Sequence, residues 1–160
     1  MYDATLAGTV YFRGHDDDLL EGYAARPLDG AGRGGVVVIH PLPGYDRATK
    51  EYVRRFADAG YDAVCPNLYS REGADVSPDD AAAAVRARGG VPDEQVMGDV
   101  AGAVSYLRGL EHSNGKVASI GWWFAAVVAL GAVRMACRAR AWMVCADDPQ
   151  LRFRDAFSAW

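Results

Sequence analysis

A run of four consecutive β-branched residues, Val36 to Ile39, constrains the fold of this chain more than any other feature. A strand with one face in water alternates apolar and polar residues, whereas an unbroken β-branched run is typical of a parallel strand buried on both faces. Burial on both faces requires other elements above and below the sheet. The run therefore predicts a layered α/β domain.

Strand-like and helix-like segments alternate along the rest of the chain. Ser77-Pro78-Asp79-Asp80 is a strong helix start, and Gly60 is well suited to end a helix. In order, we expect strands 8–13 and 19–25 as a hairpin around the polar turn 14–18, a loop at 27–35, strand 36–39, helix 47–59, strand 61–65, helix 81–88, a helix from about 92 to 107, a turn at 113–115, strand 116–121, helix 123–136 and strand 141–145. This order predicts one α/β domain over residues 1–160, with a mainly parallel sheet flanked by helices.

The charge and cysteine content argue against several classes of function. A net charge of −4 without a basic face disfavours a nucleic-acid partner or an anionic membrane surface. The three cysteines, Cys65, Cys137 and Cys145, are odd in number and lack C-x-x-C spacing, so we expect neither disulfides nor a metal site. The N-terminus has no signal-peptide pattern. We therefore expect a cytoplasmic protein with reduced thiols and no cofactor.

One uncharged stretch, residues 117–133, tests this interpretation. Its 17 residues reach the low end of the length needed to cross a bilayer. However, Trp122 and Trp123 lie in its middle rather than at its edges, and a strand-like half precedes them. We interpret the second half as a buried core helix and keep membrane association through 117–133 as an alternative.

Three loops after the predicted strands are the candidate site, because ligands of such sheets bind beyond the carboxyl ends of the strands. The surrounding motifs resemble the dienelactone hydrolase family of α/β-hydrolases, which includes the carboxymethylenebutenolidases. These motifs are Val38-Ile39-His40 through Gly44, Ala63 through Arg71, and Ser113-Asn114-Gly115-Lys116-Val117, and they occur in order and at the family spacing between about residues 5 and 121. The resemblance implies an α/β-hydrolase-like fold and hydrolysis of a lactone or ester of a small carboxylate by a Cys, His and Asp triad.

The same resemblance implies roles for single residues. Trp123 occupies the position of the family's nucleophilic cysteine, and Pro41 occupies that of a common glutamate. The backbone N–H groups of Leu42 and Phe124 match the two oxyanion donors. Arg71 matches an arginine that grips the substrate carboxylate. The family's Asp and His lie further downstream than residue 160, so we expect a C-terminally truncated domain that lacks the last family strands.

These departures bear directly on activity. An indole carbon has no lone pair with which to attack a carbonyl, so covalent catalysis at Trp123 is excluded, and Ser119 lies inside the strand before the turn. After Gly121 the sequence becomes rich in Ala, Val and Arg, a switch that a one-base slip of the reading frame would produce. We expect a weakly active or inactive hydrolase of a small-molecule ester or lactone. The alternative is a non-catalytic relic that binds small carboxylates at Arg71.

The remaining candidates favour structural roles. We interpret His40 as a hydrogen-bonded structural histidine, with a catalytic role as the alternative, and we place His15 and His112 in surface turns. Cys65 fits a small buried hydrophobe. The acidic pairs in 16–18 and 79–80 fit a turn and a helix start. A sheet edge left uncovered by the absent strands predicts self-association.

Overall fold

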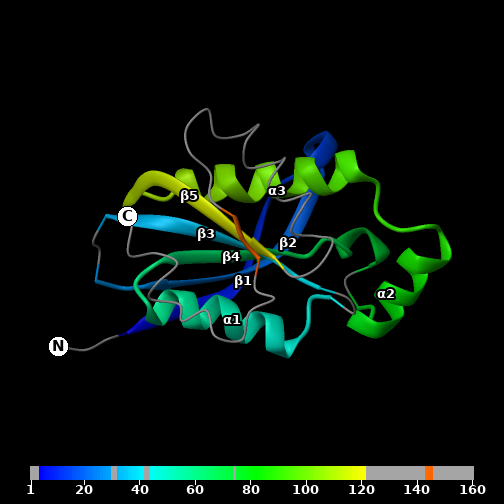
Figure 1. Ribbon diagram of the computed structural model, residues 1–160, viewed down its shortest axis with the longest axis horizontal. Coiled ribbons are helices and arrows are strands. Elements are labelled where there is room, and N and C mark those ends of the chain that lie inside the picture. The colour runs from blue at the N-terminus through cyan, green and yellow to red at the C-terminus, as the bar shows by residue number, and fades with distance from the viewer. Residues whose placement is uncertain (1–3, 30–31, 42–43, 74, 122–142, 146–160) are drawn as a thin grey trace.

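The computed structural model describes residues 4–29, 32–41, 44–73, 75–121 and 143–145. Its elements are strands β1 (Thr5–Arg13), β2 (Leu19–Pro27), β3 (Arg33–Ile39), β4 (Asp62–Pro66), β5 (Ser113–Gly121) and β6 (Met143–Cys145), helices α1 (Arg47–Asp58), α2 (Pro78–Ala87) and α3 (Asp93–Arg108), and the short 3₁₀ turns η1 (His15–Asp17) and η2 (Ser70–Glu72). Helix α3 lies along one face of the sheet and α1 along the other (Figure 1). The described part of the chain thus has the three-layered α/β arrangement that the sequence predicts.

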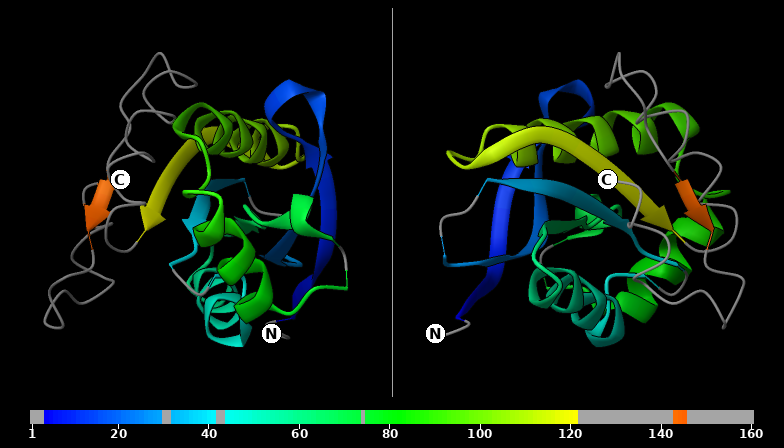
Figure 2. Two further views of the ribbon diagram at one scale, coloured as in Figure 1. Left: turned by 90° about the vertical axis from the view of Figure 1, so that its right-hand side faces the viewer. Right: turned by 60° about the vertical axis from the view of Figure 1, so that its left-hand side comes forward.

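The strands form one mixed sheet in the order β1-β2-β4-β3-β5-β6. The pairs β4–β3, β3–β5 and β5–β6 are parallel. The pairs β1–β2 and β2–β4 are antiparallel. Figure 2 shows β1 at one edge of the sheet and β6 at the other. The predicted parallel sheet is confirmed, and the N-terminal hairpin adds its antiparallel edge.

Strand β3 divides its side chains between two hydrophobic cores. Val37 and Ile39 face α3, while Val36 and Val38 face α1, and each is at most 1% exposed. The core under α3 includes Val64, Val100, Val104 and Leu107, and the core over α1 includes Val53, Phe56, Ala63 and Ile120. The β-branched run is therefore buried on both faces, as its composition predicts.

The local start and stop signals act as expected. Asp16 and Asp17 have φ values of 53° and 61°, and the Asp18 N–H donates to the His15 carbonyl at 3.1 Å, which closes the hairpin with a tight turn of the type that matches the strand twist. Ser77 caps α2 by accepting from the Asp80 N–H at 3.2 Å. Gly60, at φ 94°, lies just beyond α1.

Two segments differ from the sequence prediction. β3 begins at Arg33 rather than at residue 36, because Arg33 and Gly35 already pair with β5. Gly35 also lets α3 approach closely, since a Cβ there would lie 3.0 Å from the Leu107 side chain. The predicted turn at 113–115 lies inside β5, where the pairing register with β3 shifts. Asn114 still makes a local turn, since its side-chain oxygen accepts from the Lys116 N–H at 2.9 Å.

Other predictions fall partly outside the described residues. The expected helix 123–136 lies outside them, and of the expected strand 141–145 the structure describes residues 143–145 as β6. Within the described ranges, no helix is long and apolar enough to cross a membrane. Residues 122–133 of the alternative membrane segment are not among those ranges.

Candidate functional site

The loops that follow β3, β4 and β5 meet at one end of the sheet, the end where the carboxyl ends of these strands lie, because the three strands are neighbours and run parallel. His40 and Pro41 follow β3, the segment 67–71 follows β4, and Gly121 ends β5. The turn of the β1–β2 hairpin lies at the same end of the sheet, since β2 runs antiparallel to β4 and begins where β4 ends. The structure thus brings these loops together, but of the residues expected in the site it describes only Arg71, because Leu42, Trp123 and Phe124 lie outside the described residues.

His40 joins two of these loops. Its ring is 3% exposed, and its Nε2 accepts a hydrogen bond from the Leu68 backbone N–H at 3.1 Å. An accepting Nε2 leaves the proton on Nδ1, which donates to the Pro41 carbonyl at 3.1 Å. Both ring nitrogens are therefore engaged with backbone, the arrangement of a hydrogen-bonded structural histidine.

The surroundings of His40 keep its imidazole neutral. Burial lowers the pKa of His40 to about 4, against smaller opposing effects from its bond to Pro41 and from the Asp46 carboxylate. The ring packs edge-on against Tyr69, with a centroid distance of 4.8 Å. The neutral imidazole therefore holds the loops after β3 and β4 together. It does not exchange protons at neutral pH.

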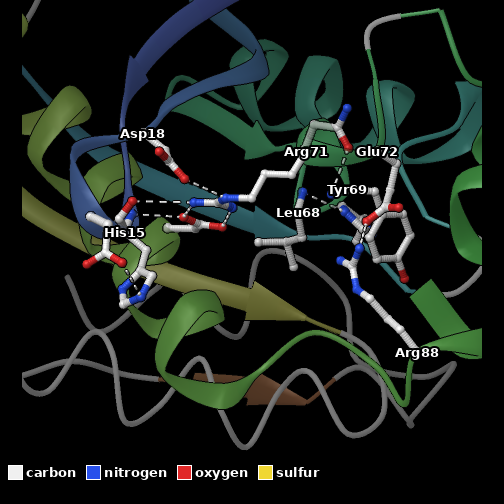
Figure 3. Close-up of polar contacts among 11 residues, drawn as sticks. His15, Asp18, Leu68, Tyr69, Arg71, Glu72 and Arg88 are labelled. Atoms are coloured by element: carbon white, nitrogen blue, oxygen red, sulfur yellow. Dashed lines mark hydrogen bonds and ion pairs between the residues drawn. The ribbon is translucent and has the colours of Figure 1, made fainter. Parts of the chain in front are cut away.

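Arg71, in η2, lies at the centre of a network of polar contacts (Figure 3). Its Nη1 donates to Asp99 Oδ2 at 2.8 Å, and its Nη2 donates to Asp99 Oδ1 at 3.1 Å. Its Nε donates to Asp18 Oδ2 at 2.8 Å, and Nη2 makes a longer contact of 3.4 Å with the carbonyl of His15. The guanidinium therefore joins the loop after β4 to α3 and to the β1–β2 turn.

Asp99 is the buried centre of this network. Its side chain is 0% exposed, and Oδ1 also accepts from the His15 backbone N–H at 2.9 Å. A buried carboxylate needs such partners, because an unpaired charge there would carry a large desolvation cost. The hydrogen bonds from Arg71 to Asp99 are the main reason that the pKa of Arg71 lies above its ordinary value.

The position of Asp99 on the apolar face of α3 could have marked it as a site residue, but the sequence analysis considered only the apolar residues of that helix. Val96, Val100 and Ala103 form the buried face of α3, and Asp99 lies on that same face by helical spacing. A single charge in an apolar stripe indicates a buried partner of opposite charge. Asp18 gave no comparable signal, because acidic residues are common in turns.

The other candidate residues have structural surroundings. Cys65 is fully buried, and burial raises the pKa of its thiol, as befits a small hydrophobe. His15 and His112, predicted to lie on the surface, are half-buried; Arg26 Nη1 donates to His112 Nε2 at 2.8 Å. Among the described residues, no group of three His, Cys, Asp or Glu side chains is arranged to hold a metal.

Comparison with known proteins identifies the family. The sequence model of the dienelactone hydrolase family matches residues 20–142, which include the loops after β3, β4 and β5. The chain belongs to the dienelactone hydrolase family. The resemblance seen in the sequence motifs is thereby confirmed.

Carboxymethylenebutenolidase from Pseudomonas putida is 33% identical to this chain over 92 residues. The match covers 54% of this chain and 39% of that relative. The namesake from Pseudomonas knackmussii gives the same values. The chain spans 32 to 39% of the length of the curated relatives that it matches.

Solved structures of other dienelactone hydrolase-like proteins share the fold. A dienelactone hydrolase-like promiscuous phosphotriesterase from metagenomic libraries superposes with a TM-score of 0.68 at 20% identity, over 98% of the chain and 77% of that protein. Dienelactone hydrolase from Anabaena variabilis superposes with a TM-score of 0.60 at 16% identity, over 82% and 58% respectively. At these identities the likeness concerns the fold alone.

Proposed function

We propose that this chain carries the scaffold of a hydrolase for lactones or esters of small carboxylates but catalyses that reaction weakly or not at all. Family membership supports the reaction class. The observation that carries the proposal is Trp123, the residue at the position where the family has its nucleophilic cysteine. An acyl-enzyme requires an atom with a lone pair to attack the carbonyl, and the indole ring supplies none.

Three side chains of the described residues, those of Cys65, Ser119 and His40, are poorly suited to replace the missing nucleophile. Cys65 is fully buried with its thiol pKa raised by burial, so it holds little thiolate at neutral pH. Ser119 lies within β5 and is 3% exposed, and His40 has both ring nitrogens bonded to backbone. None of these side chains has both the exposure and the activated form that acyl transfer needs.

Turnover of an activated ester tests the proposal. Purified chain is incubated with p-nitrophenyl acetate and, separately, with a lactone that bears a carboxylate. We expect no hydrolysis above that caused by the same amount of heat-unfolded chain, which controls for reactive lysines and thiols. Saturable turnover by the folded chain at about 10 s⁻¹, a typical kcat for an enzyme, would overturn the proposal.

A second candidate function is binding of a small carboxylate at Arg71. Arg71 follows β4 at the carboxyl edge of the sheet, its side chain is 23% exposed, and one of its partners, Asp18, is 54% exposed. This candidate needs no nucleophile. It predicts that a compound such as benzoate perturbs Arg71 without being chemically changed.

A further inference from the structure

The guanidinium of Arg71 presents two edges, and different elements occupy them (Figure 3). Asp99 of α3 takes the edge formed by Nη1 and Nη2 with two hydrogen bonds of 2.8 and 3.1 Å. The edge formed by Nε and Nη2 faces the β1–β2 turn. The Nε–H donates to the Asp18 carboxylate at 2.8 Å, whereas Nη2 makes a longer and weaker contact of 3.4 Å with the His15 carbonyl.

The two aspartates differ in how readily they can leave. Asp99 is 0% exposed and also accepts the His15 N–H, so its departure would leave a buried charge unpaired. Asp18 is 54% exposed, and its carboxylate can return to water by a side-chain rotation. The Nε edge is therefore held by an exchangeable group, and the Nη edge by a permanent one.

The charges in the cluster oppose a third carboxylate. One guanidinium faces two carboxylates, so with both aspartates ionised the three side chains sum to −1. An incoming anion meets that repulsion unless Asp18 moves away. Once Asp18 has left, Nε and Nη2 offer two parallel donors, the geometry that binds a carboxylate most strongly.

We infer that Asp18 is an internal carboxylate that closes the substrate-binding edge of Arg71 and so sets the affinity of the site for small carboxylates. The inference rests on the proposed carboxylate-binding role of Arg71. A ligand carboxylate takes the place of Asp18 on Nε and that of the His15 carbonyl on Nη2, while Asp99 stays bound. Asp18 thus competes with the ligand for Arg71.

A titration with benzoate, followed by the ¹⁵N–¹H signal of the Arg71 Nε–H group, tests the inference. Asp18→Asn keeps the shape of the side chain and removes its charge, and Asp18→Ala removes the competing oxygen as well. We expect both variants to bind benzoate about tenfold or more tightly than the unchanged chain, since a charge-assisted hydrogen bond no longer has to be broken. Asp17→Asn is the matched control, because it changes the net charge equally while Asp17 is 82% exposed and pairs with Arg13 at 3.9 Å.

The outcomes separate this inference from the proposed binding role. Equal tightening in Asp17→Asn and Asp18→Asn would indicate a long-range charge effect and overturn the role of Asp18. Binding at Arg71 with the same affinity in all variants would overturn the inference and leave carboxylate binding standing. If the Arg71 signal responds to benzoate in no variant, both are overturned.

Discussion

Arg71 and Asp99 form a two-fold hydrogen-bonded ion pair in which the carboxylate is completely buried and the guanidinium is 23% exposed. Removing only the cation would leave the Asp99 charge in an apolar setting. We expect Arg71→Gln to lower the free energy of unfolding by about 3–5 kcal/mol. Urea unfolding measures this loss.

The paired change Arg71→Gln with Asp99→Asn distinguishes a buried charge from lost packing. With both charges removed, we expect the double variant to recover part of the stability that the single Arg71 variant loses, giving a non-additive cycle. Strict additivity of the two single changes would contradict a direct Arg71–Asp99 pairing.

The burial of neutral His40 predicts that the free energy of unfolding decreases in acid. Burial lowers the pKa of His40 to about 4 from its ordinary value of 6.5, so the unfolded chain binds the proton first. The stability from neutral His40 is therefore complete above pH 6.5 and is lost as the pH falls toward 4. The shift corresponds to about 3 kcal/mol.

His40→Gln removes this titration. We expect the difference in unfolding free energy between the unchanged chain and the variant to shrink by that amount between pH 7 and pH 4, as measured by urea unfolding. Taking the difference cancels the titration of the other acids and histidines. A difference that stays constant with pH would show that His40 is not buried in neutral form.

Residues next to one another in the sequence made the local structure predictable. The β-branched run, the Ser77 cap and the glycine after α1 each act through near neighbours, and each has its expected role. The start of β3 was missed because its glycines resemble a loop. The role of Gly35 depends on Leu107, more than 70 residues away in the chain.

The candidate site was only half predictable for the same reason. Arg71 could be singled out from its place after a strand, but its partners are 28 and 53 residues away. Nothing near Asp18 distinguishes it from any acidic turn residue. Its contact with Arg71 arises only when the β1–β2 hairpin is folded beside η2.

Asp62 offers a second pH-dependent test with the opposite sign. It is 2% exposed, neither carboxylate oxygen has a hydrogen-bond partner among the described residues, and burial raises its pKa despite nearby His112, Arg33 and Arg26. A raised pKa means that stability is complete below the unfolded value of 3.8 and is lost as the pH rises through the folded value.

Asp62→Asn should therefore stabilise the chain at pH 7, by about 1 kcal/mol, because it removes an unpaired buried charge. The gain should decrease as the pH is lowered toward 4. Thermal unfolding at several pH values measures it. A variant that is less stable than the unchanged chain at pH 7 would indicate that attraction to nearby Arg33 and Arg26 outweighs the cost of burial.

Gly102 allows α3 to pack against the β1–β2 hairpin and thus holds Asp99 beside His15. A Cβ at residue 102 would lie 2.0 Å from the Arg13 carbonyl oxygen. We expect Gly102→Ala to destabilise the chain by about 2 kcal/mol, although alanine is the better helix former. Gly109→Ala is the control, since a Cβ there would come no closer than 3.4 Å to any neighbour.

Restoring a thiol at residue 123 tests the central claim most directly. Trp123→Cys and its neighbour control Trp122→Cys are each treated with p-nitrophenyl acetate, and the acetylated residue is located by mass spectrometry. We predict release of about one equivalent of p-nitrophenol by Trp123→Cys alone, with the acetyl group on residue 123, because the family resemblance implies that a cysteine at this position attacks the ester. Equal labelling of the two variants, or turnover by the unchanged chain, would contradict the assignment of residue 123 as the lost nucleophile position.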